Sequence, residues 1–247
     1  MIVTIHQPLL LPWLGYLDRM SRADLFVVLD HVQFERANYQ NRARYLLDGA
    51  PRWLTVPVLQ RSQKERILDK EIDHREIAGK APWGAAAYAT LRHAYREAPR
   101  FRDYAAPLKA LLEARWTRLA DLALASMELL RDAFGIRTPM LRSSELPVHG
   151  RKSELVLSIC KAVGATTFLG GMGGSREYLD VAMMEREGVA VTWQQFAHPV
   201  YGQCGTGEFV PGLSAIDALF NCGPTVLQRP PFLPAHAHPA AGMRAAA

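Results

Sequence analysis

The chain has 247 residues, of which 49% are hydrophobic and 21% are charged, as is typical of a globular protein with one large domain or two small ones. Its 29 Lys and Arg against 24 Asp and Glu give a net charge of +5, spread along the chain without a basic stripe. This mild positive charge suits an anionic small molecule as substrate, and it argues against duplex nucleic acid as a partner.

Features of the chain that report on its compartment point to the cytoplasm. The first residues lack the pattern of a signal peptide, and no apolar run approaches the roughly 18 residues of a membrane span. The three cysteines, Cys160, Cys204 and Cys222, show no C-x-x-C spacing. We therefore expect a cytoplasmic protein with reduced thiols and no membrane span.

The N-terminal block predicts a strand, helix, strand unit over Ile2–Ile5, Leu14–Ser21 and Ala23–Leu29. The second strand is a continuous apolar run, which favours a parallel strand buried on both faces. His6 follows the first strand and Asp30 the second. Because the carboxyl ends of parallel strands meet at one edge of a sheet, both side chains are expected at the edge where ligands bind.

A polar segment, residues 31–45, follows, and then another strand is expected over Trp53–Val58. The segment carries amides and cations that could fix a small polar ligand by hydrogen bonds. An ordinary polar surface loop is the alternative interpretation. The candidate binding residues here, together with Gln7, are Gln33, Gln40, Asn41 and Arg42.

The middle of the chain predicts helices from Trp83 to Phe134, with apolar residues spaced by three and four and Gly135 placed to end the last one. We interpret this block as a helical insertion, at about residues 82–135, within a single α/β domain of residues 1–228. Residues 229–247, rich in proline and alanine, predict a disordered tail.

The α/β alternation resumes after residue 150. Ser153 is expected to cap a helix, Ser175 to cap another that runs to about Glu187, and Ser214 with Asp217 to form a capping box. The predicted fold is therefore α/β and Rossmann-like (HUP-like), with a mostly parallel sheet. The expected elements are Ser153–Val163 (helix), Thr166–Leu169 (strand), Ser175–Glu187 (helix), Val189–Gln194 (strand) and Ser214–Asn221 (helix).

A glycine loop, Gly170–Gly174, lies between the expected strand and the helix at Ser175. Glycines let the backbone approach a ligand closely, and a helix start offers N–H groups to an anion. Gly173, Gly174, Ser175 and Arg176 are therefore candidate anion-binding residues. The loop matches neither dinucleotide nor Walker patterns, and a flexible turn that needs small residues is the alternative.

The segment after the last expected strand carries His198, Tyr201 and Gln203, which should also reach the carboxyl edge. We assign His6, Asp30 and His198 as candidate catalytic residues, and Tyr201 and Gln203 as candidate binding residues. The ligand types of the three would allow a metal, but their spacing supports none, so no metal site is predicted. Cys204 as a nucleophile is a weaker alternative, since no local feature would activate its thiol.

Several motifs, in order along nearly the whole chain, resemble the WbqC-like protein family. They are IHQPLLLPWLGY, ADLFVVLDHVQFERANYQNRAR, WLTVPV, SSEL, the glycine loop with SREYLD, FAHPVYGQ and LSAIDALFNCGP. The resemblance implies a role in bacterial O-antigen or other surface-polysaccharide biosynthesis, with transfer of an amino acid, glycine in particular, to a sugar.

A second likeness, to pantothenate synthetase and other folds with the HIGH nucleotide-binding motif, rests on the strand that ends in His6 and on the later segment SREYL, Ser175–Leu179. It implies ATP as a candidate cofactor and activation of a carboxylate before an amine accepts the acyl group. The chain departs from that pattern after His6, where the second histidine is missing.

Together these features lead to the hypothesis of an acyl or aminoacyl transferase, or an ATP-using amide ligase, that acts on an amino sugar or small amine. His6 would act as general base or hydrogen-bond donor, and Asp30 would orient it or bind the amine. The alternative is a non-catalytic module that binds a small molecule or a nucleotide sugar.

Overall fold

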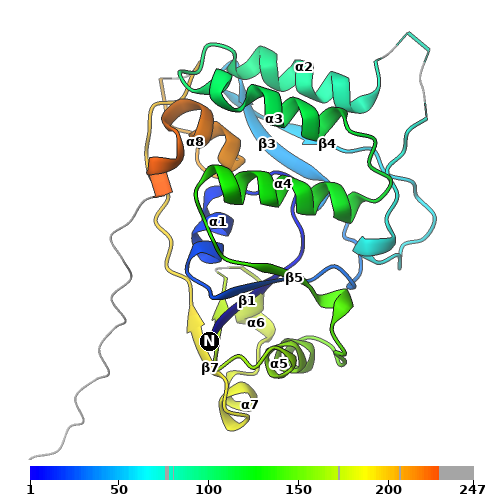
Figure 1. Ribbon diagram of the computed structural model, residues 1–247, viewed down its shortest axis with the longest axis vertical. Coiled ribbons are helices and arrows are strands. Elements are labelled where there is room, and N and C mark those ends of the chain that lie inside the picture. The colour runs from blue at the N-terminus through cyan, green and yellow to red at the C-terminus, as the bar shows by residue number, and fades with distance from the viewer. Residues whose placement is uncertain (76–77, 80, 172, 206, 228–247) are drawn as a thin grey trace, which may run out of the picture.

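The computed structural model describes residues 1–75, 78–79, 81–171, 173–205 and 207–227 (Figure 1). Its centre is a five-stranded sheet in the order β5-β2-β1-β6-β7, and every neighbouring pair in it is parallel. The prediction of an α/β fold with a mostly parallel sheet is therefore confirmed. The strands of this sheet are β1 (Ile2–His6), β2 (Leu25–Val28), β5 (Met140–Arg142), β6 (Thr167–Gly170) and β7 (Ala190–Trp193).

The strand order is that of a Rossmann-like sheet, because the chain builds outward from β1 to one side and then restarts on the other side with β6. The boundary between β1 and β6 is the topological switch point. Residue pairing of β1 with β2 continues to His6 and Val28, whereas pairing of β1 with β6 ends at Val3 and Phe168. Beyond that, Thr4 Oγ1 donates a hydrogen bond to the Leu169 carbonyl at 2.9 Å.

Helices cover both faces of the sheet, which explains why its two central strands, β1 and β2, are largely apolar and buried (Figure 1). Val3 and Ile5 of β1 pack with α5 and α7 on one face. Phe26 and Val28 of β2 pack with α1 and α4 on the other. The helices are α1 (Leu14–Ser21), α2 (Trp83–Tyr95), α3 (Phe101–Glu113), α4 (Leu119–Ala133), α5 (Ser153–Ala162), α6 (Ser175–Tyr178), α7 (Val181–Arg186) and α8 (Ala215–Cys222).

The predicted helical block is confirmed as helices α2, α3 and α4, and Gly135 follows them with a positive φ of 69°. These helices share one apolar core with α1 and α8. Their interpretation as an insertion into a single domain stays a prediction. Short 3-10 helices add η1 (Ile67–Asp69), η2 (Ser143–Glu145) and η3 (Pro224–Leu227).

An antiparallel hairpin of β3 (Arg42–Leu47) and β4 (Ala50–Thr55) lies apart from the main sheet. The strand predicted over Trp53–Val58 is confirmed in part as β4, which begins three residues earlier, whereas β3, which begins within the polar segment, was not predicted. The overlooked signal is Asp48-Gly49, a two-residue turn in which both residues have positive φ, at 51° and 72°. Such turns match the twist of a hairpin and favour Asp-Gly.

The predicted caps at Ser153 and Ser175 are wrong, since neither side chain caps its helix. Ser153 begins α5, but its hydroxyl donates to the Tyr178 carbonyl and accepts the Asp180 amide instead of capping that helix. The single helix expected from Ser175 to Glu187 is two helices, and Asp180 caps the second by accepting the amide of Met183.

The predicted disordered tail, residues 229–247, lies outside the described residues. No helix in the described part of the chain could cross a membrane, since none combines the length and the apolar character required.

Candidate functional site

Two of the candidate elements predicted from the sequence, His6 and the glycine loop, lie at the switch point. His6 ends β1 on one side of it, and the glycine loop follows β6 on the other. Ligands of open α/β sheets bind at such a point, outside the carboxyl ends of the strands. We use the term switch-point site for His6, Tyr16, Arg19 and Gly171.

His6 lies on the α1 face of the sheet, because side chains alternate along a strand and those of Val3 and Ile5 occupy the opposite face. Its ring packs edge-on against Tyr16, with 5.0 Å between ring centroids. Its Nδ1 is 2.9 Å from the Gln7 carbonyl oxygen. Because a carbonyl can only accept a hydrogen bond, we assign the ring proton to Nδ1, which leaves Nε2 as the basic nitrogen.

The pKa of His6 is lowered to about 3, mainly because burial disfavours the charged ring and secondarily because of the nearby Arg19 charge. The hydrogen bond to Gln7 opposes these effects. In the ligand-free protein the imidazole is therefore neutral at physiological pH.

This lowered pKa predicts an acid sensitivity that a His6→Asn variant should lack. Between about pH 3 and pH 6.5 the unfolded state binds a proton at His6 that the folded state does not, so stability falls as the pH falls through this window. Between about pH 7 and pH 5, the free energy of unfolding should fall by about 2 kcal/mol more for the wild type than for the variant. Above pH 6.5 the difference between the two proteins should stay constant. Urea unfolding at both pH values measures it, and parallel stability curves would contradict the assignment.

Arg19 is a site residue that the sequence analysis missed. It lies on α1, a helix whose residues from Leu14 to Met20 are all buried, and its side chain is only 6% exposed. Side chains of a helix lean toward its N-terminus, which here carries the guanidinium toward the carboxyl edge of the sheet. The guanidinium carbon lies 6.0 Å from the centroid of Tyr16, three residues earlier. The spacing of three residues between Tyr16 and Arg19, which places both on one face of the helix, was the sequence feature that could have identified Arg19.

Gly171, in the loop after β6, lies against the Arg19 guanidinium. A Cβ at Gly171 would lie 1.7 Å from Arg19 Nη1, so a larger residue here would displace the guanidinium. Gly173 and Gly174 differ, because a Cβ there would meet no described atom within 4 Å. Arg176, predicted to bind an anion, is exposed, and its guanidinium carbon lies 5.3 Å from the centroid of Trp193.

The predicted amide cluster is brought partly to the site. The buried Gln40 donates to the Gln7 side-chain oxygen at 2.8 Å, which joins the polar segment to the end of β1. Its own oxygen accepts the Glu35 amide. The neighbouring Asn41 and Arg42 instead contact β4 and its continuation: Asn41 donates to the Val56 carbonyl, and the Arg42 guanidinium stacks over Trp53. Gln33 donates to the Gln63 carbonyl.

Asp30 follows β2 as predicted, but its carboxylate is turned toward β5 and η2. It is fully buried and accepts hydrogen bonds from Arg142 Nε at 2.6 Å and from the amide and hydroxyl of Ser144 at 3.0 and 2.8 Å. Desolvation opposes ionisation, but these donors hold the pKa of Asp30 below its usual value. The carboxylate is therefore a charged structural tie between strands.

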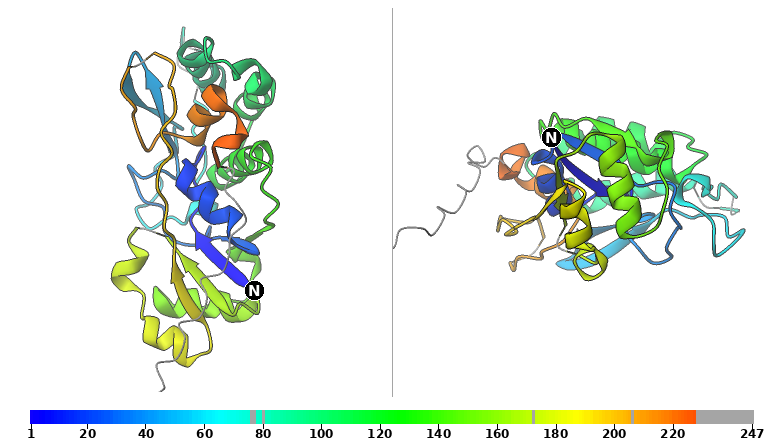
Figure 2. Two further views of the ribbon diagram at one scale, coloured as in Figure 1. Left: turned by 90° about the vertical axis from the view of Figure 1, so that its left-hand side faces the viewer. Right: turned by 90° about the horizontal axis from the view of Figure 1, so that it is seen from below.

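His198, Tyr201 and Gln203 gather at α8. The segment that leaves β7 passes α1 and reaches the hairpin and α8 (Figure 2), and the His198 ring packs against Phe196, Tyr201 and Phe209. Tyr201 Oη and Gln203 Nε2 each donate to Asp217 Oδ2 at 2.8 Å.

Asp217 itself was misread. Ser214 does cap α8, but the Asp217 carboxylate is buried at 0% exposure beside Tyr201 and Gln203 rather than closing a capping box. Burial raises its pKa, against the lowering effect of its donors.

A Tyr201→Phe variant should be less stable by about 1 to 3 kcal/mol at neutral pH, because it removes a donor from this buried carboxylate. The pKa of Asp217 should rise further. Since the folded state then holds its proton more tightly than the unfolded state, the loss should shrink as the pH falls toward the unfolded value of 3.8. Urea unfolding of this variant is compared with that of Tyr178→Phe, since Tyr178 is 43% exposed. Equal losses of stability in the two variants would contradict the prediction.

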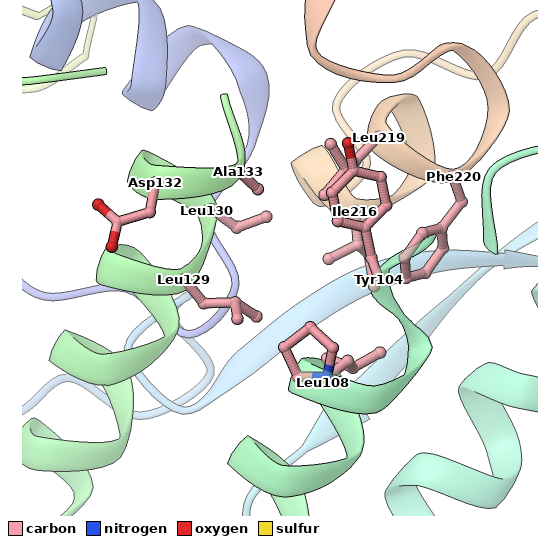
Figure 3. Close-up of a pocket in the computed structure, with 10 residues that line it drawn as sticks. Tyr104, Leu108, Leu129, Leu130, Asp132, Ala133, Ile216, Leu219 and Phe220 are labelled. Carbon is pink, nitrogen blue, oxygen red and sulfur yellow. The ribbon is translucent and has the colours of Figure 1, made fainter. Parts of the chain in front are cut away.

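An apolar pocket of about 260 Å³ lies away from the sheet, between α3, α4 and α8 (Figure 3). Leu108, Leu130 and Ile216 are among its walls, while the Asp132 carboxylate points away from them. It offers little polar chemistry for recognising a substrate. No group of three or more His, Cys, Asp or Glu side chains within the described ranges could hold a metal ion.

Comparison with known proteins identifies a relative over most of the chain. The chain is 28% identical over 226 residues to the uncharacterized protein Rv1507c of Mycobacterium tuberculosis, covering 90% of this chain and 94% of that one. No solved structure matches the chain. The model of the WbqC-like protein family matches residues 7–229, and the chain thus belongs to that family.

Proposed function

We propose that the chain is an acyl or aminoacyl transferase, or an ATP-using amide ligase, that forms an amide on an amino sugar or another small amine. Glycine is the proposed acyl group, and bacterial surface polysaccharides the proposed pathway, as the family resemblance implies. The observation that carries the proposal is the switch-point site, where His6 ends β1 and the buried Arg19 lies against Gly171 of the glycine loop. Family membership supports the role in polysaccharide biosynthesis.

Formation of an amide requires a group that accepts a proton from the amine nitrogen. The amine nitrogen forms a bond to the acyl carbon, the bond to the leaving group breaks, and the nitrogen loses a proton. His6 Nε2 is the proposed acceptor, because Nδ1 already donates to Gln7. An anionic substrate would offset the Arg19 charge and raise the pKa of His6 toward a useful range.

The remaining predicted residues take different parts in the proposal. Gln7 and Gln40, hydrogen-bonded to each other beside His6, are proposed to bind the acceptor amine. The loop from Gly173 to Arg176 is proposed to contact the anionic group of the donor. Asp30 and His198 are proposed to support the fold around the site, since Asp30 contacts η2 and the His198 ring stacks on Tyr201, which donates to Asp217 of α8.

Mass spectrometry of the products tests the proposal. The protein is incubated with glycine, ATP and a panel of amino sugars and nucleotide-linked amino sugars, with enzyme-free mixtures as controls. A new species at the mass of the glycyl amide, formed together with AMP or ADP, is the expected result. If no acceptor in the panel is acylated, either with ATP and glycine or with preformed aminoacyl donors, the transferase and ligase proposals are both wrong.

A non-catalytic module for a small molecule or a nucleotide sugar is the second candidate, and one observation favours it. The lowered pKa of His6, near 3, suits a neutral hydrogen-bonding group better than a base. In a thermal-shift screen, this candidate predicts stabilisation by a nucleotide sugar alone. The ligase predicts stabilisation by ATP together with an amino acid.

A further inference from the structure

Two other cations drawn from solvent, Lys70 and Arg142, are each paired with a carboxylate. Lys70, 1% exposed, has its Nζ 2.7 Å from Glu65, and the half-buried Arg142 has its Nε 2.6 Å from Asp30. Pairing offsets the cost of taking a charge out of water. Arg19 departs from this pattern.

Arg19 forms no ion pair with any residue in the described part of the chain, and its buried Nε has no hydrogen-bond partner there. Burial lowers its pKa to about 10, so the guanidinium remains charged at neutral pH. An uncompensated buried charge is costly, and such a cost is kept where another molecule supplies the counter-charge.

The surroundings of Arg19 suit an oxyanion. The loop backbone at Gly171 lies directly against Nη1, and the ring of Tyr16 lies beside the guanidinium. The Arg19 charge lowers the pKa of His6, so an anion bound to Arg19 would also interact electrostatically with His6. The position is at the switch point, between the carboxyl ends of two parallel strands.

We propose that the Arg19 guanidinium, held against Gly171 at the switch point, binds an oxyanion of the substrate, either a carboxylate or a phosphoryl group. A guanidinium offers parallel N–H donors that match either group. This inference rests on the proposed function for the identity of the site as the substrate site. It adds the residue that recognises the anion.

The glycines beside Arg19 differ in their surroundings. Gly173 and Gly174 are exposed, and a side chain at either would find open space. A side chain at Gly171 would instead displace the Arg19 guanidinium.

Thermal stability of Arg19→Met, with and without anions, tests the proposal. Methionine fills similar space without charge, so the ligand-free variant should be at least as stable as the wild type. Inorganic phosphate, pyrophosphate and glycine are the probes, and calorimetric titration gives the affinities. At least one probe should stabilise the wild type, and Arg19→Met should weaken its binding by about 10- to 100-fold. Response to glycine alone would identify a carboxylate, and response to the phosphates a phosphoryl group.

Two further variants guard the interpretation. Arg96→Met removes an exposed positive charge at the end of α2, 62% exposed, and should bind the probes as the wild type does. Gly171→Ala should remain folded and lose affinity, because its Cβ displaces Arg19 Nη1. If the wild type binds none of the probes, or if Arg19→Met or Gly171→Ala binds them unchanged, the inference is wrong. Binding by wild type with no acylation of any acceptor would instead refute the proposed reaction and leave the inference standing.

Discussion

Replacement of Asp30 by alanine should lower the free energy of unfolding by about 3 kcal/mol or more. Its carboxylate is fully buried and joins the end of β2 to Arg142 of β5 and to Ser144. The variant would leave the hydroxyl and amide of Ser144 without their acceptor and weaken the hold on the Arg142 guanidinium. Urea unfolding at neutral pH measures the loss.

The matched control is Asp121→Ala, which removes the other carboxylate that binds Arg142, at 2.9 Å. Asp121 is 42% exposed, so its ion pair should contribute about 1 kcal/mol or less. A large loss for Asp30→Ala and a small one for Asp121→Ala would establish the structural tie. If Asp30→Ala were as stable as the wild type but inactive, the catalytic role predicted from the sequence would be the correct one.

The behaviour of Asp30 illustrates what local sequence can and cannot predict. The run Ala23–Leu29 correctly indicated a buried parallel strand, and the position of Asp30 after it correctly indicated the carboxyl edge. The direction of its side chain depends on Arg142, 112 residues later in the chain. No pattern within one element reveals such a partner.

Arg19 and Asp217 differ from the sequence analysis because both side chains are buried, which no local pattern indicated. Arg19 was not singled out by the sequence analysis, and α1 packs against the sheet on one side and against other helices on the other, so that Arg19 is buried. Asp217 fitted a capping box, yet its carboxylate receives donors from a loop that returns from β7. In both cases the sequence identified the element, and tertiary packing decided the environment of its charge.

Loss of turnover in His6→Ala, by about 100-fold or more, is the largest effect expected on activity. It follows from the proposed role of Nε2 as proton acceptor and applies once a product has been detected. The fold should survive, because the ring lies at the end of β1 and accounts for one edge contact with Tyr16 and one hydrogen bond to Gln7. Rates at saturating substrate, together with circular dichroism, measure both.

Two substitutions separate proton transfer from positioning. His6→Asn can keep a donor to the Gln7 carbonyl in place of Nδ1 but has no group in place of Nε2, so it should be as inactive as the alanine variant while it still binds substrate. His31→Ala is the control, since His31 lies after β2 at the same edge, away from the switch point, with its Nδ1 2.7 Å from Ser143 Oγ. If His6→Asn retained most of the turnover, Nε2 would not carry the proton, and His6 would be a residue that positions Gln7 and the loop after β1.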